Sequence, residues 1–390
     1  MKVVIVHNII APYRIPLFNR LAASPGIDLT VLFMAETEAN RHWDTGRLRQ
    51  EIRFPYEILG GLHLRRGEST IHINPGLISR LGSLRPDVVI VTSLSAATAM
   101  GLAYRRLGRY RLVSWWAGTA LTEAKVGPLK RAWRKILIPR MDAFVCYSRA
   151  AAAYVEKADG HPDRIFIAGN VTIDAEEFRR RVELARPRTS EWRKRMGLQD
   201  ARVILSVGQL VPRKNHLGLL ESFSPLQDRF DRAALVIVGE GPLRSELQRL
   251  ASDRRLRRVI FTGHVQPDEL PLYYAAADLF VDLTLRDHWS QVVGEAMAAG
   301  LPALVSSADH ASELIEDGVS GFVVDPEDVE SVSSLALRLL ETDRTARTVG
   351  AAALETVRRR DVRYTSRVFR DCLDRLGKQG GRTPALEVPG

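Results

Sequence analysis

Apolar residues recur along the chain in two patterns. Short uninterrupted apolar runs, such as Val3–Val6 and Ala234–Val238, have the length and β-branched content of strands that are buried on both faces. Longer segments with apolar residues at helical spacing, such as Leu77–Leu84 and Arg149–Lys157, lie between these runs. The alternation occurs on both sides of a charged stretch at residues 176–200. It predicts an α/β fold with parallel sheets.

The chain has 390 residues, which exceeds the usual size of a single hydrophobic core. We therefore predict two Rossmann-like domains that face a cleft, with ligands at the carboxyl ends of the strands. The expected N-terminal domain covers residues 1–180, a linker covers 181–200, and a C-terminal domain covers 201–360. Residues 35–75 are expected to be irregular, with His42, His63 and His72 as surface or turn residues, and residues 378–390 to be a disordered tail.

Composition narrows the class of protein. Hydrophobic residues make up 45% of the chain and charged residues 26%, which is ordinary for a globular protein. No stretch approaches the apolar length of a membrane span and the N-terminus enters directly as a strand, so neither a transmembrane helix nor a signal peptide is expected. Cys146 and Cys372 lack CxxC spacing, which excludes a zinc ribbon and fits a reducing cytoplasm.

The net charge of +10 is concentrated in the N-terminal half. Residues 1–200 carry 32 Lys and Arg against 19 Asp and Glu, whereas residues 201–390 carry 24 against 27. Residues 128–140 form a basic segment with Leu129, Trp133, Ile136 and Leu137 at helical spacing. This pattern suits a helix on an anionic membrane surface, and equally an ordinary helix whose apolar side belongs to the core.

The most informative stretch runs from Asp287 to Pro302 and reads as loop, short helix and stop. Ser290 suits an N-cap, and Gly300 followed by Pro302 ends the helix. The start of such a helix is a ready anion site. Glu295 lies in the body of an otherwise apolar helix, where an unpaired charge is costly. It needs a partner, either a pair of ligand hydroxyls or a surface salt bridge.

A second informative stretch follows the predicted strand Arg202–Val207. Gly208 ends that strand, and Arg213 and Lys214 stand in the loop before an apolar helix. Paired cations at the carboxyl end of a strand suit a diphosphate, because Arg can bind two oxygens and Lys adds a point charge. They would also stabilise the charge that grows on a departing phosphate. The alternative is a solvated loop.

These stretches together resemble the family-4 retaining glycosyltransferases, which have the GT-B fold. Asp287 and Glu295 take the two positions of the family's Glu-x7-Glu signature, and Lys214 matches its pyrophosphate-binding lysine. The resemblance implies that Asp287 orients the donor sugar, that Glu295 holds the ribose, and that the loop between them gives backbone amides to the diphosphate. It further implies a C-terminal helix, residues 361–377, that crosses back to the N-terminal domain.

Four positions depart from the family pattern. Asp287 is one methylene shorter than the usual Glu, and Ser290 replaces the usual Gly. Gln209 stands where the family has an Arg on the pyrophosphate, and Arg213 is the candidate that compensates. Ala117 stands where many relatives place a His near the transferred sugar, so proton handling by that His is not transferred to this chain.

The resemblance defines a donor side and an acceptor side. The expected catalytic residues are Lys214, Asp287 and Glu295. The expected donor-binding residues are Gly208, Gln209, Arg213, Lys214, Val265, Asp287, Trp289, Ser290, Gln291, Val292 and Glu295. The expected acceptor-side residues are Asn8, Pro12, Tyr13 and Arg14, from a segment similar to one branch of the family. The alternative for Asn8 and Arg14 is that they only brace the turn. Trp115 and Trp116 are expected in the core rather than stacked on a sugar or lipid.

The sequence thus predicts a cytoplasmic retaining glycosyltransferase of the hexosyltransferase type, and it leaves open whether the protein is peripheral at the inner face of the plasma membrane. Its donor would be a nucleotide-diphosphate sugar, and its acceptor a sugar or a lipid-linked or cell-envelope polysaccharide intermediate. No cofactor is expected, and no metal either, because the site segments lack an Asp-x-Asp pair. The alternatives are a nucleotide-sugar 2-epimerase of related fold and a basic membrane- or nucleic-acid-binding protein without catalysis. No nucleic-acid partner is expected, because residues 101–150 contain no recognisable binding motif.

Overall fold

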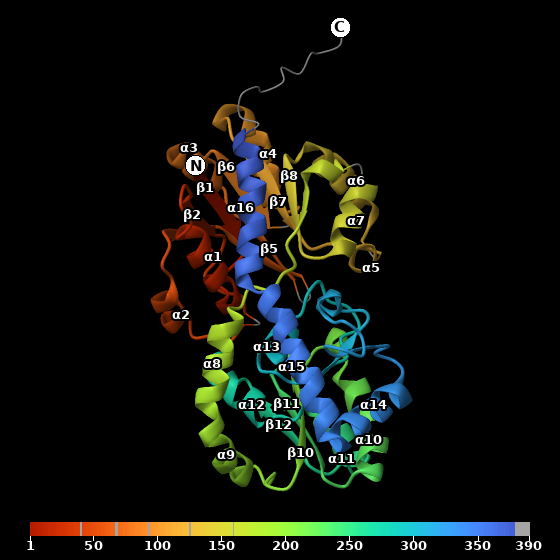
Figure 1. Ribbon diagram of the computed structural model, residues 1–390. Coiled ribbons are helices and arrows are strands. Elements are labelled where there is room, and N and C mark those ends of the chain that lie inside the picture. The colour runs from red at the N-terminus through yellow and green to blue at the C-terminus, as the bar shows by residue number, and fades with distance from the viewer. Residues whose placement is uncertain (40, 67–68, 93, 125, 159, 379–390) are drawn as a thin grey trace. The chain divides into compact units, whose positions relative to one another are not determined.

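The computed structural model describes residues 1–39, 41–66, 69–92, 94–124, 126–158 and 160–378. The chain divides into two compact units (Figure 1). Unit 1 comprises residues 1–41, 45–169 and the chain from Arg363 onward, and unit 2 comprises residues 42–44 and 170–362. The expected tail at 378–390 lies outside the described residues, apart from Lys378.

Unit 1 is built around a seven-stranded sheet in the order β3-β2-β1-β6-β7-β8-β9, in which every pair of neighbours is parallel. Its strands are β1 (Lys2–His7), β2 (Asp28–Phe33), β3 (Tyr56–Ile58), β6 (Val88–Thr92), β7 (Arg111–Trp116), β8 (Ala143–Cys146) and β9 (Ile165–Ile167). β1 pairs with both β2 and β6, so the strand order reverses at its carboxyl end. Ligand sites of such sheets lie at this position.

The helices of unit 1 connect these strands. They are α1 (Ile15–Ala22), α2 (Thr45–Glu51), α3 (Leu77–Leu84), α4 (Ala96–Gly108), α5 (Ala120–Glu123), α6 (Pro128–Leu137), α7 (Arg149–Lys157) and α16 (Val362–Lys378), with short 3-10 turns η1 (Pro12–Arg14), η2 (Ile138–Arg140) and η3 (Pro162–Arg164). α16 closes unit 1, because Phe369 packs edge-on against Trp115 with ring centroids 5.0 Å apart. Trp115 and Trp116 are buried, as the sequence predicted.

Residues 35–75 are more regular than expected. Besides α2 and β3 they form an antiparallel hairpin of β4 (Leu62–Arg66) and β5 (Ser69–Ile73). The expectation that His72 is a surface or turn residue is wrong, because it is buried and its Nε2 lies 3.0 Å from the carboxylate of Glu38. Its Nδ1 also lies 2.9 Å from Nδ1 of His63, its cross-strand neighbour. Cross-strand pairing was invisible in the sequence because the hairpin alternates apolar and polar residues only briefly.

Unit 2 contains a six-stranded parallel sheet in the order β12-β11-β10-β13-β14-β15. The strands are β10 (Arg202–Val207), β11 (Ala233–Val238), β12 (Val259–Gly263), β13 (Leu279–Asp282), β14 (Ala303–Ser306) and β15 (Phe322–Val324). The strand order reverses at β10, which pairs with both β11 and β13. The loops after β10 and β13 carry the two stretches that the sequence singled out, so the fold brings them to the same edge of this sheet.

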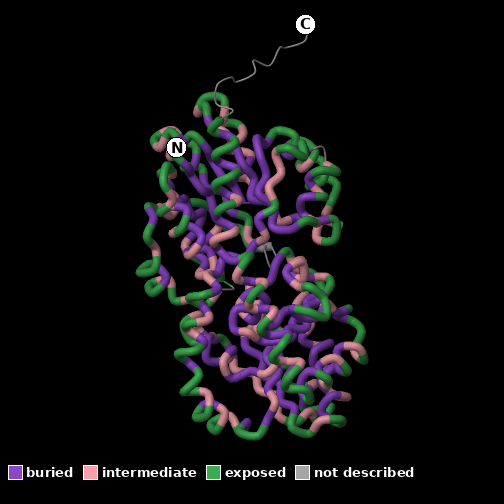
Figure 2. The backbone as a smooth tube through the Cα atoms, viewed as in Figure 1, coloured by how far each residue is buried: buried purple, intermediate pink, exposed green. Residues whose placement is uncertain are grey.

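The helices of unit 2 are α8 (Ala175–Ala185), α9 (Thr189–Arg195), α10 (His216–Arg229), α11 (Arg244–Asp253), α12 (Leu270–Ala276), α13 (Gln291–Ala298), α14 (Val329–Glu341) and α15 (Asp343–Arg359), with 3-10 turns η4 (Arg186–Arg188), η5 (Pro212–Lys214) and η6 (His310–Leu314). In both units the central strands, such as β1, β6, β7, β10, β11 and β13, are mostly buried while the helices expose their outer sides (Figure 2).

The division between the units differs from the expected boundary at 180 and the expected linker at 181–200. α8 packs against α12 and α13, and α9 packs against α12, so this whole stretch belongs to unit 2. The reason is an apolar stripe among the charges: Phe178, Val182 and Trp192 are buried. A high density of surface charge on these helices concealed that stripe in the sequence.

Candidate functional site

The candidate site lies at the carboxyl ends of β10 and β13 in unit 2. The loop after β10 is held by the chain that follows β11. Gly239 has a φ of 151°, and a Cβ atom there would lie 1.8 Å from the carbonyl oxygen of Gly208. Only glycine fits this approach. The amide of Gly208 donates to the carbonyl of Val238, so the start of the loop is fixed by backbone contacts.

Lys214 extends from this loop and is largely buried. Its Nζ donates to Oδ2 of Asp287 at 2.8 Å, to the hydroxyl of Ser290 at 2.7 Å and to the hydroxyl of Thr284 at 3.2 Å. An ammonium has three hydrogen-bond donors, and these partners account for all of them. Burial alone would lower the pKa of Lys214, but the neighbouring carboxylates, Asp287 first, hold that pKa above its ordinary value.

Asp287 joins the two predicted stretches. Its Oδ2 accepts from Nη1 of Arg213 at 2.7 Å as well as from Lys214, and its Oδ1 accepts from the amides of His288 at 2.8 Å and Trp289 at 3.4 Å. Burial acts to raise the pKa of Asp287, but Lys214 and Arg213 outweigh it and hold the pKa well below the ordinary range. The carboxylate is therefore charged over the whole working pH range.

Ser290 occupies the N-cap position of α13, but its hydroxyl makes no hydrogen bond to the first turn of the helix. The predicted capping role of that hydroxyl is wrong, because the hydroxyl accepts a hydrogen bond from the ammonium of Lys214 instead. The amide of Ser290 donates to Oδ1 of Asp309 at 3.2 Å. A hydrogen bond from a charged ammonium is stronger than one from a neutral amide. The hydroxyl of Ser290 therefore accepts from Lys214 rather than from the first turn of α13.

Two buried carboxyl groups of the site were not predicted. Asp309 follows β14, and its Oδ1 also accepts from the amide of Ala311 at 2.8 Å, whereas its Oδ2 has no hydrogen-bond partner among the described residues. Burial, followed by the charges of Asp282 and Asp287, raises the pKa of Asp309 to about 7. Asp282 ends β13 and its Oδ1 binds both the amide and the hydroxyl of Thr284. These groups place additional negative potential beside Lys214.

Glu295 lies further along α13, with its carboxylate inside the unit. Its Oε2 accepts the hydroxyl hydrogen of Tyr274 at 2.8 Å. Burial raises the pKa of Glu295 above its ordinary value. Glu295 therefore has a buried hydrogen-bond partner, as opposed to the surface salt bridge that the sequence left open. Tyr274 was not singled out, because it lies within an ordinary apolar helix.

The other predicted donor-side residues surround this core. Gln291 anchors the start of α13 to the segment after β9, because its Nε2 donates to the carbonyl of Asn170 at 2.7 Å and its Oε1 accepts from the hydroxyl of Thr172 at 3.2 Å. Trp289 and Val265 are buried, and the carbonyl of Val292 accepts from Tyr274 at 3.5 Å. Gly208 and Gln209 begin the loop that carries Arg213 and Lys214.

The predicted acceptor-side residues lie in unit 1, after β1. Arg14 is buried, its Nη2 donates to the hydroxyl of Tyr147 at 2.7 Å, and its guanidinium lies 4.2 Å from the ring centroid of Trp115. The side-chain oxygen of Asn8 accepts from the hydroxyl of Thr92 at 3.3 Å. Both side chains thus brace the turn, which the sequence had left open, while Pro12 and Tyr13 in η1 are partly exposed.

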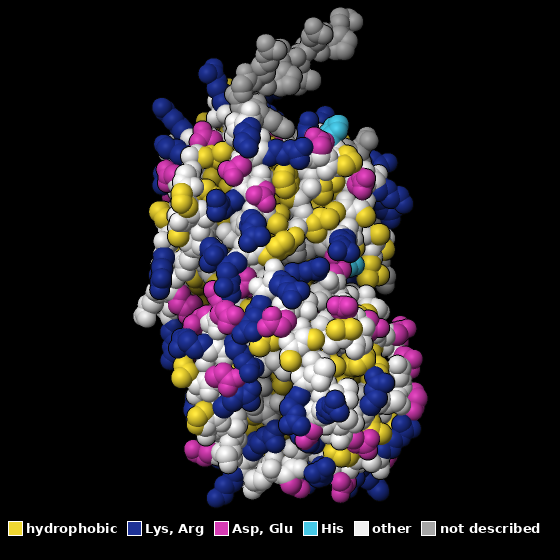
Figure 3. Space-filling model, viewed as in Figure 1, with side chains coloured by type: hydrophobic (Ala, Val, Ile, Leu, Met, Phe, Trp, Pro, Cys, Tyr) yellow, Lys and Arg dark blue, Asp and Glu magenta, His cyan; other side chains and the backbone are white. Residues whose placement is uncertain are grey.

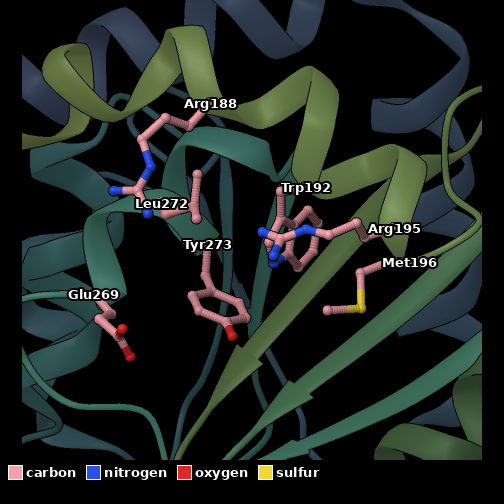
Figure 4. A pocket seen from close by; sticks show the side chains of 7 residues that line it. All are labelled: Arg188, Trp192, Arg195, Met196, Glu269, Leu272 and Tyr273. Carbon is pink, nitrogen blue, oxygen red and sulfur yellow. The ribbon is translucent and has the colours of Figure 1, made fainter.

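A cavity of about 290 Å³ lies elsewhere in unit 2, between α9 and α12 (Figure 4). Its lining residues are Arg188, Trp192, Arg195, Met196, Glu269, Leu272 and Tyr273. None of them is a predicted site residue, so the cavity is separate from the cluster around Lys214.

Comparison with known proteins agrees with this geometry. Residues 188–356 match the model of glycosyl transferases group 1, and residues 17–172 match the model of glycosyltransferase family 4. Among solved structures, HepE of Anabaena in complex with UDP has a TM-score of 0.78 at 18% identity, over 96% of this chain and 100% of that chain. The two Rossmann-like units therefore have the architecture of the GT-B class.

The two family models together span most of both units, so the chain belongs to glycosyltransferase family 4. The resemblance on which the sequence prediction rested is confirmed.

Curated relatives match parts of the chain. The chain is 36% identical over 168 residues to the GDP-mannose-dependent alpha-(1-6)-phosphatidylinositol monomannoside mannosyltransferase of Mycolicibacterium smegmatis. This match covers 41% of this chain and 44% of that protein. It is 25% identical over 317 residues to the sulfoquinovosyl transferase SQD2 of Arabidopsis thaliana, which covers 77% of this chain and 59% of that protein. The match thus spans less than two thirds of either relative.

Proposed function

We propose that this chain is a retaining hexosyltransferase that moves a sugar from a nucleotide-diphosphate sugar to an acceptor. The observation that carries the proposal is the convergence of Lys214 and Arg213 with Asp287 at the mouth of α13. Two cations beside a helix start form a strong site for a diphosphate. The mannosyltransferase relative is named for a GDP-mannose donor, and HepE was solved with UDP, which supports a nucleotide-linked donor of this kind.

In this proposal the charges act mainly on the leaving group. Negative charge grows on the diphosphate as the glycosidic bond breaks, and cations that are already in place stabilise it without reorganisation. Lys214 and Arg213 supply that stabilisation, so no metal is assigned to the step. The diphosphate also helps to take the acceptor's proton during attack on the same face of the sugar, which gives retention.

We propose roles for the two acids from their remaining contacts. Glu295 has a partly buried carboxylate that accepts from Tyr274, and it can also accept from the hydroxyls of a ribose. Asp287 stands next to the cations and orients the hydroxyls of the donor sugar. Pro12 and Tyr13 in unit 1 remain the proposed acceptor side, on a turn that Asn8 and Arg14 brace.

We further propose that the acceptor is lipid-linked and that α6 meets an anionic membrane surface. Leu129, Trp133 and Ile136 lie at i, i+4 and i+7 of α6, and their side chains are 84%, 40% and 47% exposed. Leu137 is the buried residue of this helix. The apolar stripe is therefore outside the core, contrary to the alternative of an ordinary core helix.

Cations flank that stripe. Lys130, Arg131 and Lys135 are exposed on α6, and the net basic charge of the N-terminal half favours the same kind of surface. Figure 3 shows Lys and Arg side chains next to hydrophobic ones over the part of unit 1 where Figure 1 places α6. Within the described residues, no helix has both the length and the apolarity to cross a bilayer. We therefore propose peripheral attachment at the cytoplasmic face.

The experiment that tests the function has two parts. Thermal unfolding in the presence of UDP, GDP and their sugars identifies the donor by the ligand that raises the melting temperature. Incubation of that donor with and without a membrane lipid extract then separates the rival enzymes. A transferase forms its glycosylated product only with the extract, whereas a 2-epimerase alters the sugar without it. Epimer formation in the absence of acceptor would contradict the proposal.

A further inference from the structure

We infer that Asp287 is an internal ligand of the diphosphate site, and that its carboxylate competes with the phosphates of donor and product for Arg213 and Lys214. The inference rests on the proposed function, because it concerns regulation of the same site.

The first argument is a count of hydrogen-bond donors on Lys214. Asp287, Ser290 and Thr284 take the three donors of its ammonium group. A phosphate oxygen can bind this ammonium only if one of these partners leaves. Asp287 is the partner that carries a charge, so it is the one whose attraction for the cation a phosphate must match.

The second argument concerns the set of groups around the carboxylate. Its Oδ2 holds two cations, and its Oδ1 holds the backbone amides of His288 and Trp289 at the mouth of α13. Cations and free amides at a helix start are the groups that bind a phosphate. The side chain of Asp287 therefore satisfies an anion site in the way that a phosphate would.

The third argument concerns the backbone amide that follows those of His288 and Trp289, which already has a hydrogen-bond acceptor. The amide of Ser290 donates to Asp309, which is buried and anchored through the amide of Ala311. Asp309 thus holds the start of α13 in place while Asp287 is released.

The competition distinguishes donor from product. When an intact donor binds, the displaced carboxylate of Asp287 gains the hydroxyls of the sugar as new partners. When the nucleoside diphosphate product is bound, the sugar is gone and the carboxylate has lost both cations without compensation. The return of Asp287 to Arg213 and Lys214 therefore favours release of the product over release of the donor.

The test measures binding of pyrophosphate, UDP and GDP by isothermal titration calorimetry to the wild type and to Asp287→Asn. Removing the charge should tighten binding of pyrophosphate, and of the nucleotide that the wild type prefers, by about tenfold, within the usual range of coupling between two ligands. Affinity for the intact donor should rise less, because the variant also loses the contact with the sugar. Binding of pyrophosphate to the variant that is equal to or weaker than binding to the wild type would overturn the inference.

Three further variants complete the design. Asp287→Ser removes the same charge if Asp287→Asn unfolds, and the melting temperature of each variant reports folding. Asp287→Glu keeps the charge and should bind pyrophosphate as weakly as the wild type. Glu269→Gln removes one negative charge from the separate cavity of unit 2 and should change nothing.

The outcomes separate the inference from the function on which it rests. If pyrophosphate binds Asp287→Asn more tightly but neither protein binds a nucleotide, the internal ligand stands and the transferase proposal falls. If one nucleotide binds both proteins equally well, the transferase proposal stands and the internal ligand is refuted.

Discussion

The hydroxyl of Tyr274 on α12 donates a hydrogen bond of 2.8 Å to Oε2 of Glu295 on α13. Tyr274 is buried and Glu295 is partly buried, so this bond orients the carboxylate that we assign to the ribose. The contact links a helix with no obvious motif to the second acid of the signature.

The first prediction concerns this contact. Tyr274→Phe should cost about 1–2 kcal/mol of stability, because the partly buried carboxylate of Glu295 loses its donor. It should also raise the KM for the donor several-fold with a smaller change in kcat. Glu295→Gln should raise that KM further. Initial-rate kinetics and thermal unfolding measure these effects, and a Glu295→Gln enzyme with unchanged donor KM would refute the assignment to the ribose.

The second prediction concerns pH and Asp309. The pKa of Asp309 is raised to about 7 from an ordinary value near 4, so between these pH values the folded protein holds a proton that the unfolded chain releases. Stability from this group is complete below pH 4 and is lost as the pH rises toward 7. Asp309→Asn stays neutral and keeps an oxygen for the amides of Ser290 and Ala311. Its melting temperature should therefore fall less than that of the wild type between pH 5 and 8.

The matched control for that prediction is Asp317→Asn, because Asp317 accepts the amide of Val323 away from the site. Its melting curve should follow the wild type across the same pH range. Parallel curves for Asp309→Asn and the wild type would show that Asp309 does not titrate in this window.

The third prediction concerns α6. Replacing Leu129 and Trp133 by Ser should weaken co-sedimentation with vesicles that contain anionic lipid, because each buried apolar side chain contributes about 1.5–3 kcal/mol. Reversing the charges of Lys130 and Lys135 should also weaken co-sedimentation. High salt should abolish this electrostatic contribution to binding. The control is Leu184→Ser, an equally apolar side chain that is 64% exposed on α8. Equal sedimentation of all variants would contradict a role for α6.

The fourth prediction concerns metal ions. The proposal assigns charge stabilisation to Lys214 and Arg213, so turnover should persist after treatment with EDTA and dialysis. The measurement is the initial rate with and without added Mg²⁺ or Mn²⁺. A rate that disappears with EDTA and returns with metal would contradict the assignment.

Much of the fold could be predicted from the sequence because strand and helix patterns alternate strongly. The helices Leu77–Leu84 and Arg149–Lys157 begin and end where the pattern placed them. The hairpin of β4 and β5 could not be predicted, because it is formed by cross-strand pairs and joined to Glu38 through His72. Such contacts join residues that no local pattern connects.

The site divides in the same way. Sequence motifs identified Lys214, Arg213 and Asp287. In the structure both cations contact the carboxylate of Asp287. Asp282 had a usable signal, since it is a carboxylate at the carboxyl end of an apolar strand. Asp309 and Tyr274 had none, because their roles come from tertiary contacts to Ser290 and Glu295. The capping role expected of Ser290 failed because Lys214 competes for the same hydroxyl.

The most direct test of the central claim is turnover by Lys214→Ala and Lys214→Gln, with Lys194→Ala on the exposed side of α9 as the control. Removing one preorganised group that stabilises transition-state charge typically costs about 100-fold in kcat or more. The account predicts such a loss in both Lys214 variants, with folded proteins by circular dichroism and wild-type turnover in Lys194→Ala. Near-normal turnover in a folded Lys214 variant would contradict it.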